Sequence, residues 1–359
     1  MDEWFAPLPV HTPGSDGCRS CKALSRAFAA GEVVRIRHGF YVDTDLWWDA
    51  NSAQRYATTV KAVAGRLHQP VFTGPTALIL HGLPVVETPA TIDVLTSTPT
   101  RAGVQTTISA YHQGHLRADG DLPYIPRTRQ VYVPAPQIAE DLHVPQIHTT
   151  VQTQPLPVVL VDTLVDLDFC AALPVVDSLL SGRSRDGIHW DRAELAQVLT
   201  GRDGTAEHSG LARVLHHATD LSESAGESLS RGRMIELGFE LPELQVSMRG
   251  ADGREYRPDF WWRHLGLIGE FDGWGKYAAP GPDTDVFEAL RQEKIREDAL
   301  RDRGLRVMRW GWEDALDPLR FAELLVRHGV PRRRRASIRW TASSCTSHQP
   351  PPATPPSTK

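Results

Sequence analysis

The chain has 359 residues, of which 41% are hydrophobic, and a formal net charge of -5. This length and composition predict two or three globular domains. No apolar run approaches the roughly 20 residues that a membrane-spanning helix needs, and the first residues, MDEWFAPLPV, lack the pattern of a signal peptide. We therefore expect a soluble, cytoplasmic protein with no membrane partner. Four cysteines in a chain of this length exclude a disulfide framework.

Positive charge is concentrated in two segments. The tail, residues 331–359, carries six basic residues and no acid, so the rest of the chain has a net charge of -11. This tail is also rich in proline, and we expect it to be disordered, either as a solubilising end or as a DNA-binding arm. Residues 17–41 carry five basic residues and one acid. Because an acidic body does not attract nucleic acid as a whole, any DNA contact must be local.

The first predicted elements lie within residues 17–41. The stretch CKALSRAFAAGEVVRIRHGFYV predicts a short helix that ends at Ala30-Gly31, followed by a β-hairpin with Gly39 near its turn. This pattern resembles the end of the winged helix-turn-helix in AbiEi-type antitoxin regulators. The resemblance implies a partial winged-helix segment over residues 1–45, with DNA contacts from Arg26, Arg35 and Arg37. The alternative is a small α/β segment that packs on the next domain.

Residues 46–205 are predicted to form an α/β middle domain. A helix opens at Thr73-Gly74-Pro75, where a phosphate-binding loop would require more glycines and a lysine. The stretches PATIDVLTSTPT and LPVVLVDTLVDLDF read as strands and a following helix. Similar segments occur in the middle domain of the AbiEi-like regulators, and the resemblance implies an AbiEi-like middle domain here.

The elements after this domain predict an α/β core with a mixed sheet. A helix begins near Ser224 and stops at Gly238, and two strands, REYRPDFWW and LGLIGEFDG, form a hairpin that turns near His264. A long polar helix then ends at Gly304 and is followed by a strand, LRVMRW. This order of elements is typical of a sheet covered by helices.

Three carboxylates lie within the predicted hairpin. Side chains alternate along a strand, so Glu270 and Asp272 share one face, and a register that pairs Asp259 with either of them brings all three together. Three like charges repel unless a cation lies between them, and Mg²⁺ is commonly held by one or two carboxylates. The alternative is an outer sheet face in contact with water. Glu227 likewise has two interpretations, because Ser224-x-x-Glu227 also fits a capping box.

The order of these motifs resembles the PD-(D/E)XK nuclease superfamily, and within it the very-short-patch-repair (Vsr)-like endonucleases. The resemblance covers about residues 210–330 and rests on Glu227, on Pro258-Asp259, on Glu270-Phe271-Asp272 and on the strand endings EFDGWGKY and LRVMRWGW. It implies a catalytic site made of Glu227, Asp259, Glu270 and Asp272, with the last three as metal ligands. Asp272 occupies the usual lysine position, so Lys276 or Lys294 must supply the positive charge, and Arg309 is a candidate DNA contact.

The resemblance implies a metal-dependent DNA endonuclease that hydrolyses phosphodiester bonds in defence or repair, with Mg²⁺ or Mn²⁺ as cofactor and DNA as partner. The alternative is a DNA-binding transcriptional regulator of the antitoxin kind, in which the nuclease fold is inactive. Such a regulator would have a toxin partner or form a homodimer. With either function, residues 331–359 form a basic, proline-rich tail.

Overall fold

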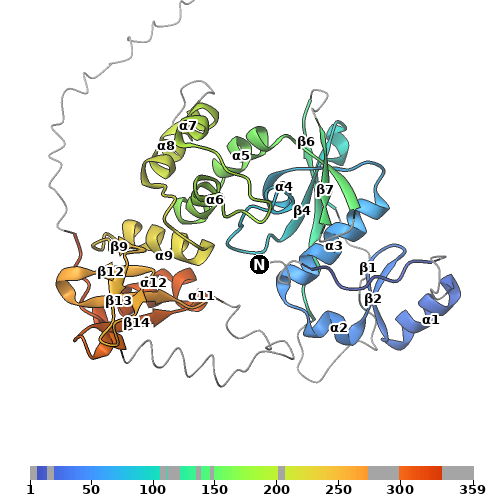
Figure 1. Cartoon of the computed structure of the whole chain (residues 1–359). Coiled ribbons are helices and arrows are strands. Elements are labelled where there is room, and N and C mark those ends of the chain that lie inside the picture. Colours follow the sequence, from blue (N-terminus) through green and yellow to red (C-terminus); the bar gives the residue numbers. More distant parts are fainter. Residues whose placement is uncertain are drawn as a thin grey trace, which may run out of the picture.

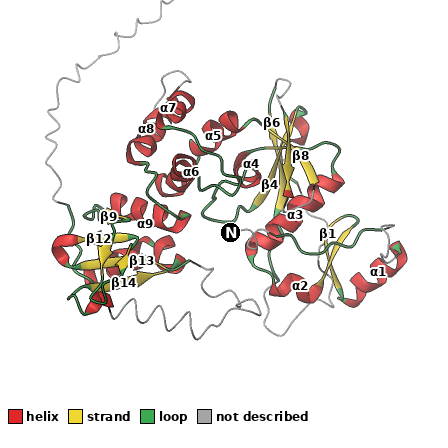
Figure 2. Cartoon of the chain, viewed as in Figure 1, coloured by secondary structure: helices red, strands yellow, loops and turns green. Residues whose placement is uncertain are grey.

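The computed structural model describes residues 6–13, 20–105, 111, 122–134, 139–145, 149–200, 207–273 and 299–333. Within these ranges the protein has the mixed α/β structure that the sequence predicts, and both larger sheets contain parallel and antiparallel strand pairs (Figure 1). Figure 2 shows helices beside both of these sheets and further helices beside the separate amino-terminal hairpin. None of the helices in the described ranges has both the length and the apolar character required to cross a bilayer.

The amino-terminal segment folds as a helix followed by a hairpin. Its elements are α1 (Cys21–Ala30), β1 (Val33–Arg37), β2 (Phe40–Asp43), α2 (Thr44–Asp49) and α3 (Ser52–Arg66). Helix α1 ends at Gly31 with φ 79°, and the hairpin turns at Gly39 with φ 86°, both conformations that favour glycine. The predicted helix and hairpin are therefore present. One helix precedes the hairpin in the described residues, and the winged-helix assignment stays a prediction.

A six-stranded sheet follows, in the order β5-β6-β4-β3-β8-β7. Its elements are β3 (Val71–Phe72), α4 (Gly74–Leu80), β4 (Thr91–Thr96), β5 (Gly103–Val104), β6 (Arg127–Tyr132), β7 (Glu140–Val144) and β8 (Thr149–Thr153). Tyr56 and Val60 of α3 pack with Phe72, Ile92 and Val151 from this sheet, and all five are buried. This cluster is the core of the middle part of the chain.

A group of helices comes next: α5 (Leu156–Leu164), α6 (Phe169–Ser181), α7 (Arg192–Thr200) and α8 (Glu207–His217). The segment that begins at Leu156 is therefore helical, and the strand before it is β8. A short apolar run fits either element, and Pro157 near the start of α5 suits a first helical turn, where no backbone N–H is needed.

The carboxy-terminal part contains a four-stranded mixed sheet in the order β14-β13-β12-β9. Its elements are α9 (Ala225–Glu236), β9 (Glu243–Leu244), β10 (Met248–Arg249), β11 (Glu255–Tyr256), β12 (Phe260–Trp262), β13 (Leu267–Phe271), β14 (Arg306–Trp310), α11 (Trp312–Leu316) and α12 (Pro318–Arg327). Strands β13 and β14 are parallel, whereas β12 is antiparallel to both of its neighbours.

The first strand of the predicted hairpin is broken. A single strand over residues 254–262 was expected, but β11 pairs with β10 in a separate ribbon and β12 begins at Phe260. Pro258 lies in the break, and proline cannot donate a ladder hydrogen bond. The second strand and the turn near His264 agree with the expectation.

One hydrophobic core joins the helical group to the carboxy-terminal sheet. Leu173 of α6 and Leu229 of α9 belong to the same buried cluster as Phe260, Trp310 and Phe321. The core therefore contains residues from both sides of the boundary expected between residues 205 and 210. Helix α9 lies at the junction of the two parts (Figure 1).

A buried ion pair crosses this junction. Arg231 of α9 donates to Asp177 of α6, with Nη2 to Oδ2 at 2.9 Å, and the two side chains are 8% and 1% exposed. Asp177 also accepts from the Thr219 N–H at 2.7 Å. Burial raises the pKa of Asp177, and the Arg231 charge opposes that rise. Each buried charge is thus stabilised by the opposite charge of its partner.

Replacing Asp177 with Ala leaves the Arg231 guanidinium buried without a carboxylate. We expect the free energy of unfolding to fall by about 3–5 kcal/mol, because an uncompensated buried charge is costly. Urea unfolding followed by tryptophan fluorescence measures this change. The exposed pair Arg263–Glu243 provides the control, since Glu243→Ala should hardly move the unfolding midpoint. Equal losses in the two variants would contradict the prediction.

Candidate functional site

Glu227 occupies the first turn of α9 and is 6% exposed. The Ser224 hydroxyl caps the helix by accepting from the Glu227 N–H at 3.2 Å and donates to Glu227 Oε1 at 2.8 Å. Glu227 Oε2 accepts from the Glu223 N–H at 2.9 Å. The predicted capping pair is present, although the glutamate reaches the amide of Glu223 instead of that of Ser224.

Gln245 links Glu227 to the segment that carries Asp259. Its side-chain Nε2 donates to Glu227 Oε2 at 3.0 Å, and its backbone N–H donates to the Asp259 carbonyl at 3.3 Å. Gln245 has φ 52°, a left-handed conformation that costs a non-glycine residue free energy and is common at functional sites. No pattern in the sequence distinguishes this glutamine, so reasoning from the sequence missed it.

The charge of Glu227 is coupled to that of Asp259. Burial and, to a smaller extent, the negative charge of Asp259 raise the pKa of Glu227 to about 7, against the hydrogen bonds that Glu223, Ser224 and Gln245 donate. Two carboxylates from distant parts of the chain are therefore close enough to repel each other.

Asp259 and Glu270 meet at the carboxyl end of β13. Phe260 pairs with Gly269 in the antiparallel ladder, and continuing this register by one residue brings Asp259 opposite Glu270. Opposed residues in an antiparallel pair share one face. Asp259 Oδ2 accepts from the Phe271 N–H at 2.8 Å, which ties the carboxylate to the next strand. Glu270 is 5% exposed, so this acid is buried within the sheet layer.

Asp272 follows β13 and pairs with Arg309. Arg309 Nη1 donates to Asp272 Oδ1 at 3.4 Å, and Arg309 lies beside Glu270 in the parallel ladder of β13 and β14. The Asp272 N–H donates to the Trp310 carbonyl at 2.8 Å, which extends the pairing past the end of β13. Arg309 is thus engaged with an acid of the site, whereas the sequence suggested a phosphate contact.

Lys276 and Lys294 lie outside the described residues, as does the tail from residue 334. Among the residues that are described, no three His, Cys, Asp or Glu side chains form a group that could hold a metal ion together. The predicted set of three ligands, Asp259, Glu270 and Asp272, is therefore not assembled as one cluster. Asp259 and Glu270 are adjacent in register, while Asp272 turns to Arg309.

The three amino-terminal arginines have different surroundings. Arg26 is exposed on α1, and the Arg35 guanidinium lies 4.8 Å from the centre of the Phe28 ring. Arg37 donates to the Pro126 carbonyl at 2.7 Å and to Thr128 Oγ1 at 3.2 Å, and burial lowers its pKa to about 10. Arg37 therefore joins the hairpin to the segment before β6, and its guanidinium already has partners within the protein.

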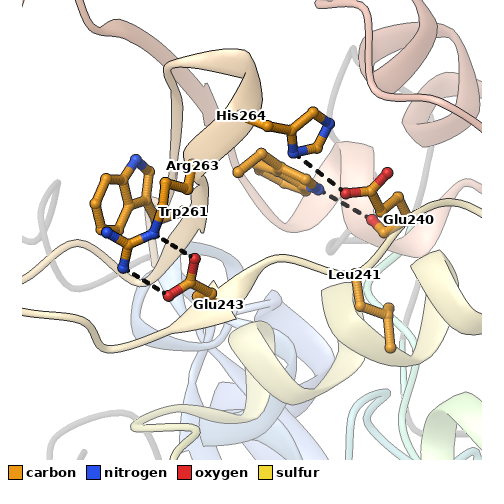
Figure 3. Close-up of a pocket in the computed structure, with 7 residues that line it drawn as sticks. Glu240, Leu241, Glu243, Trp261, Arg263 and His264 are labelled. Atoms are coloured by element: carbon orange, nitrogen blue, oxygen red, sulfur yellow. Dashed lines mark hydrogen bonds and ion pairs between the residues drawn. The ribbon is translucent and has the colours of Figure 1, made fainter.

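A cavity of about 280 Å³ lies at the other end of β12 (Figure 3). Arg263 lies flat over Trp261, 4.0 Å from the ring centre, and binds both carboxylate oxygens of Glu243 at 2.9 Å. His264 Nδ1 is 3.4 Å from Glu240 Oε1. The Arg263 and Glu243 charges offset each other in this cavity, which lies at the end of β12 away from Asp259.

Comparison with known proteins gives two relatives, both from Mycobacterium tuberculosis and named uncharacterized protein MT2308 and uncharacterized protein Rv2248. Each is 30% identical to this chain over 138 residues, which is 38% of this chain and 48% of the relative. The chain thus spans about half the length of the curated relatives that it matches. No protein-family model and no solved structure matches the chain.

Gly226 is required by the close approach of α9 to β13. A Cβ at this position would lie 1.9 Å from Phe271 Cε1, so Gly226→Ala should lower the free energy of unfolding by about 1–3 kcal/mol through overpacking. Gly210 of α8 has nothing within 4 Å of such a Cβ, and Gly210→Ala should raise stability by up to about 1 kcal/mol. Urea unfolding of both variants tests this difference, and equal effects would contradict it.

Glu227 should make stability depend on pH. Its pKa rises from 4.5 to about 7 on folding, so the folded state binds the proton more tightly than the unfolded state. This contribution is fully present below the unfolded pKa and is lost as the pH rises through about 7, a loss of about 3 kcal/mol. Urea unfolding across this window measures the loss. The profile of Glu227→Gln should be flatter, and parallel profiles for the two proteins would refute the assignment.

Proposed function

We propose that residues 210–330 act as a metal-dependent DNA endonuclease that hydrolyses phosphodiester bonds. The observation that carries this proposal is the gathering of acids at the carboxyl end of β13, where Asp259 directly precedes the Phe260–Gly269 pair and accepts from the Phe271 N–H, one residue after Glu270. Glu227, from the start of α9, is coupled electrostatically to Asp259 at the same end of the sheet. Acids drawn from three elements provide the oxygen donors that a hard divalent cation takes.

The oxygen donors available suit Mg²⁺ or Mn²⁺. Mg²⁺ is usually held by one or two carboxylates while water and substrate phosphate complete its coordination, so Asp259 and Glu270 are a sufficient pair of protein ligands. When bound, such an ion would activate a water molecule and neutralise charge that develops on the phosphodiester.

Each remaining residue has a distinct role in the proposal. Glu227 is a positioning residue, because its two oxygens accept from Ser224, Glu223 and Gln245 and hold the start of α9 against the strand that carries Asp259. Asp272 and Arg309 form an ion pair beside this site. The positive charge that the nuclease reaction needs near the phosphate is assigned to Lys276 or Lys294.

A second candidate function is a DNA-binding regulator of the antitoxin kind that keeps the nuclease fold without turnover. The pairing of Asp272 with Arg309 favours this alternative, since it leaves two of the three predicted ligands together. A toxin partner or a homodimer would then be required for regulation. Cleavage under any divalent metal distinguishes the two functions.

Purified protein should nick or linearise plasmid DNA with Mg²⁺ or Mn²⁺ and not with EDTA. Asp259→Asn and Glu270→Gln should each lower the rate by at least about a hundredfold, as is typical when one preorganised electrostatic group is removed. Asp302→Asn, at an exposed position in the turn before β14, is the matched control and should cleave like the parent. A parent protein that cleaves with no divalent metal present, or variants that retain full activity, would refute the proposed site.

A further inference from the structure

Two arginines beside the acidic residues share one carboxylate oxygen. Arg183, in the loop after α6, donates from Nη2 to Glu223 Oε1 at 2.9 Å, and Arg257, just before β12, donates from Nη2 to the same oxygen. Their side chains are 43% and 50% exposed. A single carboxylate balances one of the two guanidinium charges, so the group of three carries a net charge of +1 at the surface.

This group lies at the edge of the candidate site. The backbone N–H of Glu223 donates to Glu227 Oε2 at 2.9 Å. Glu223 therefore contacts Glu227 through its backbone and both arginines through its carboxylate. Arg257 precedes Asp259 by two residues. The arginine pair and the acids are thus joined through both the start of α9 and the start of β12.

Arg183 is held in place before any ligand arrives. Its Nη1 donates to the Ser222 carbonyl at 3.2 Å and to the Asp220 carbonyl at 3.4 Å. A cavity of about 30 Å³ beside it is lined by Arg183, Ser222 and Ser224 among others, with room for one water molecule or one phosphate oxygen. Ser222 is 5% exposed, and its hydroxyl has no hydrogen-bond partner in the described part of the chain.

We propose that Arg183 and Arg257 bind a backbone phosphate of the nucleic acid next to the bond that is cleaved, an inference that rests on the proposed function. Guanidinium groups match phosphate oxygens with two parallel hydrogen bonds, and both side chains reach solvent. The acids of the site repel phosphate, and the protein body is acidic, so a local positive contact is required for DNA to approach. Arg37 is largely buried against the Pro126 carbonyl, and the Arg309 side chain is 28% exposed, so both are less accessible to a phosphate than Arg183 and Arg257.

Binding of a short fluorescein-labelled DNA duplex in EDTA tests this inference independently of cleavage. Arg183→Gln and Arg257→Gln should each weaken binding several-fold at every sequence and lower the slope of log K against log salt by about one, as expected for one lost phosphate contact. Arg263→Gln is the matched control, because Arg263 is likewise exposed and paired with a glutamate but lies at the other end of β12. It should change neither quantity.

The outcomes separate this inference from the proposed function. If Arg183→Gln and Arg257→Gln bind as tightly as the parent with the same salt slope, or weaken no more than Arg263→Gln, the arginine pair is not a phosphate site, whatever the cleavage assay shows. A parent that binds no duplex in EDTA also overturns it. The inference is supported if Arg257→Gln loses DNA binding at a normal thermal midpoint and Arg257→Lys restores DNA binding. This holds even when no cleavage is seen.

Discussion

Helix α9 is buried on two sides, and the close packing that this requires determines how the carboxy-terminal part of the protein is built. Gly226 faces Phe271 at a distance that no Cβ could occupy, and a Cβ on Gly232 would lie 3.2 Å from Cys170 of α6. Ser230 accepts from the Trp310 indole N–H at 2.8 Å. Small residues on both sides therefore let the helix approach α6 and the sheet together, while Arg231 meets the buried Asp177.

The same packing fixes the electrostatics of the candidate site. Since α9 begins at Ala225, its first turn carries Glu227 to the end of the sheet at which Asp259 and Glu270 lie. Burial of Glu227 there, together with the nearby negative charge of Asp259, raises the pKa of Glu227. Gln245 adds a neutral donor between Glu227 and the Asp259 segment. The result is an acidic centre within an acidic protein.

Such a centre attracts cations but repels the phosphates of nucleic acid. A nucleic-acid ligand would therefore need positive charge nearby, and the arginines provide it. Arg183 and Arg257 reach the surface around Glu223, at the boundary between the helical group and the carboxy-terminal sheet. Arg309 is less exposed and forms an ion pair with Asp272. Arg309 thus compensates an acid of the site, whereas the side chains of Arg183 and Arg257 remain accessible to a ligand.

The elements that depend on neighbouring residues could be predicted from the sequence: the Ser224 cap of α9, the turns at Gly31 and Gly39, and the strand that contains Glu270. These follow from side-chain periodicity and from the conformations that glycine and proline allow. Which charges meet depends instead on how the elements pack. The pairing of Arg309 with Asp272, the bridge through Gln245 and the shared oxygen of Glu223 join residues 18 to 40 positions apart, whose contacts depend on how α9, α6 and the sheet pack and leave no periodic pattern in the chain.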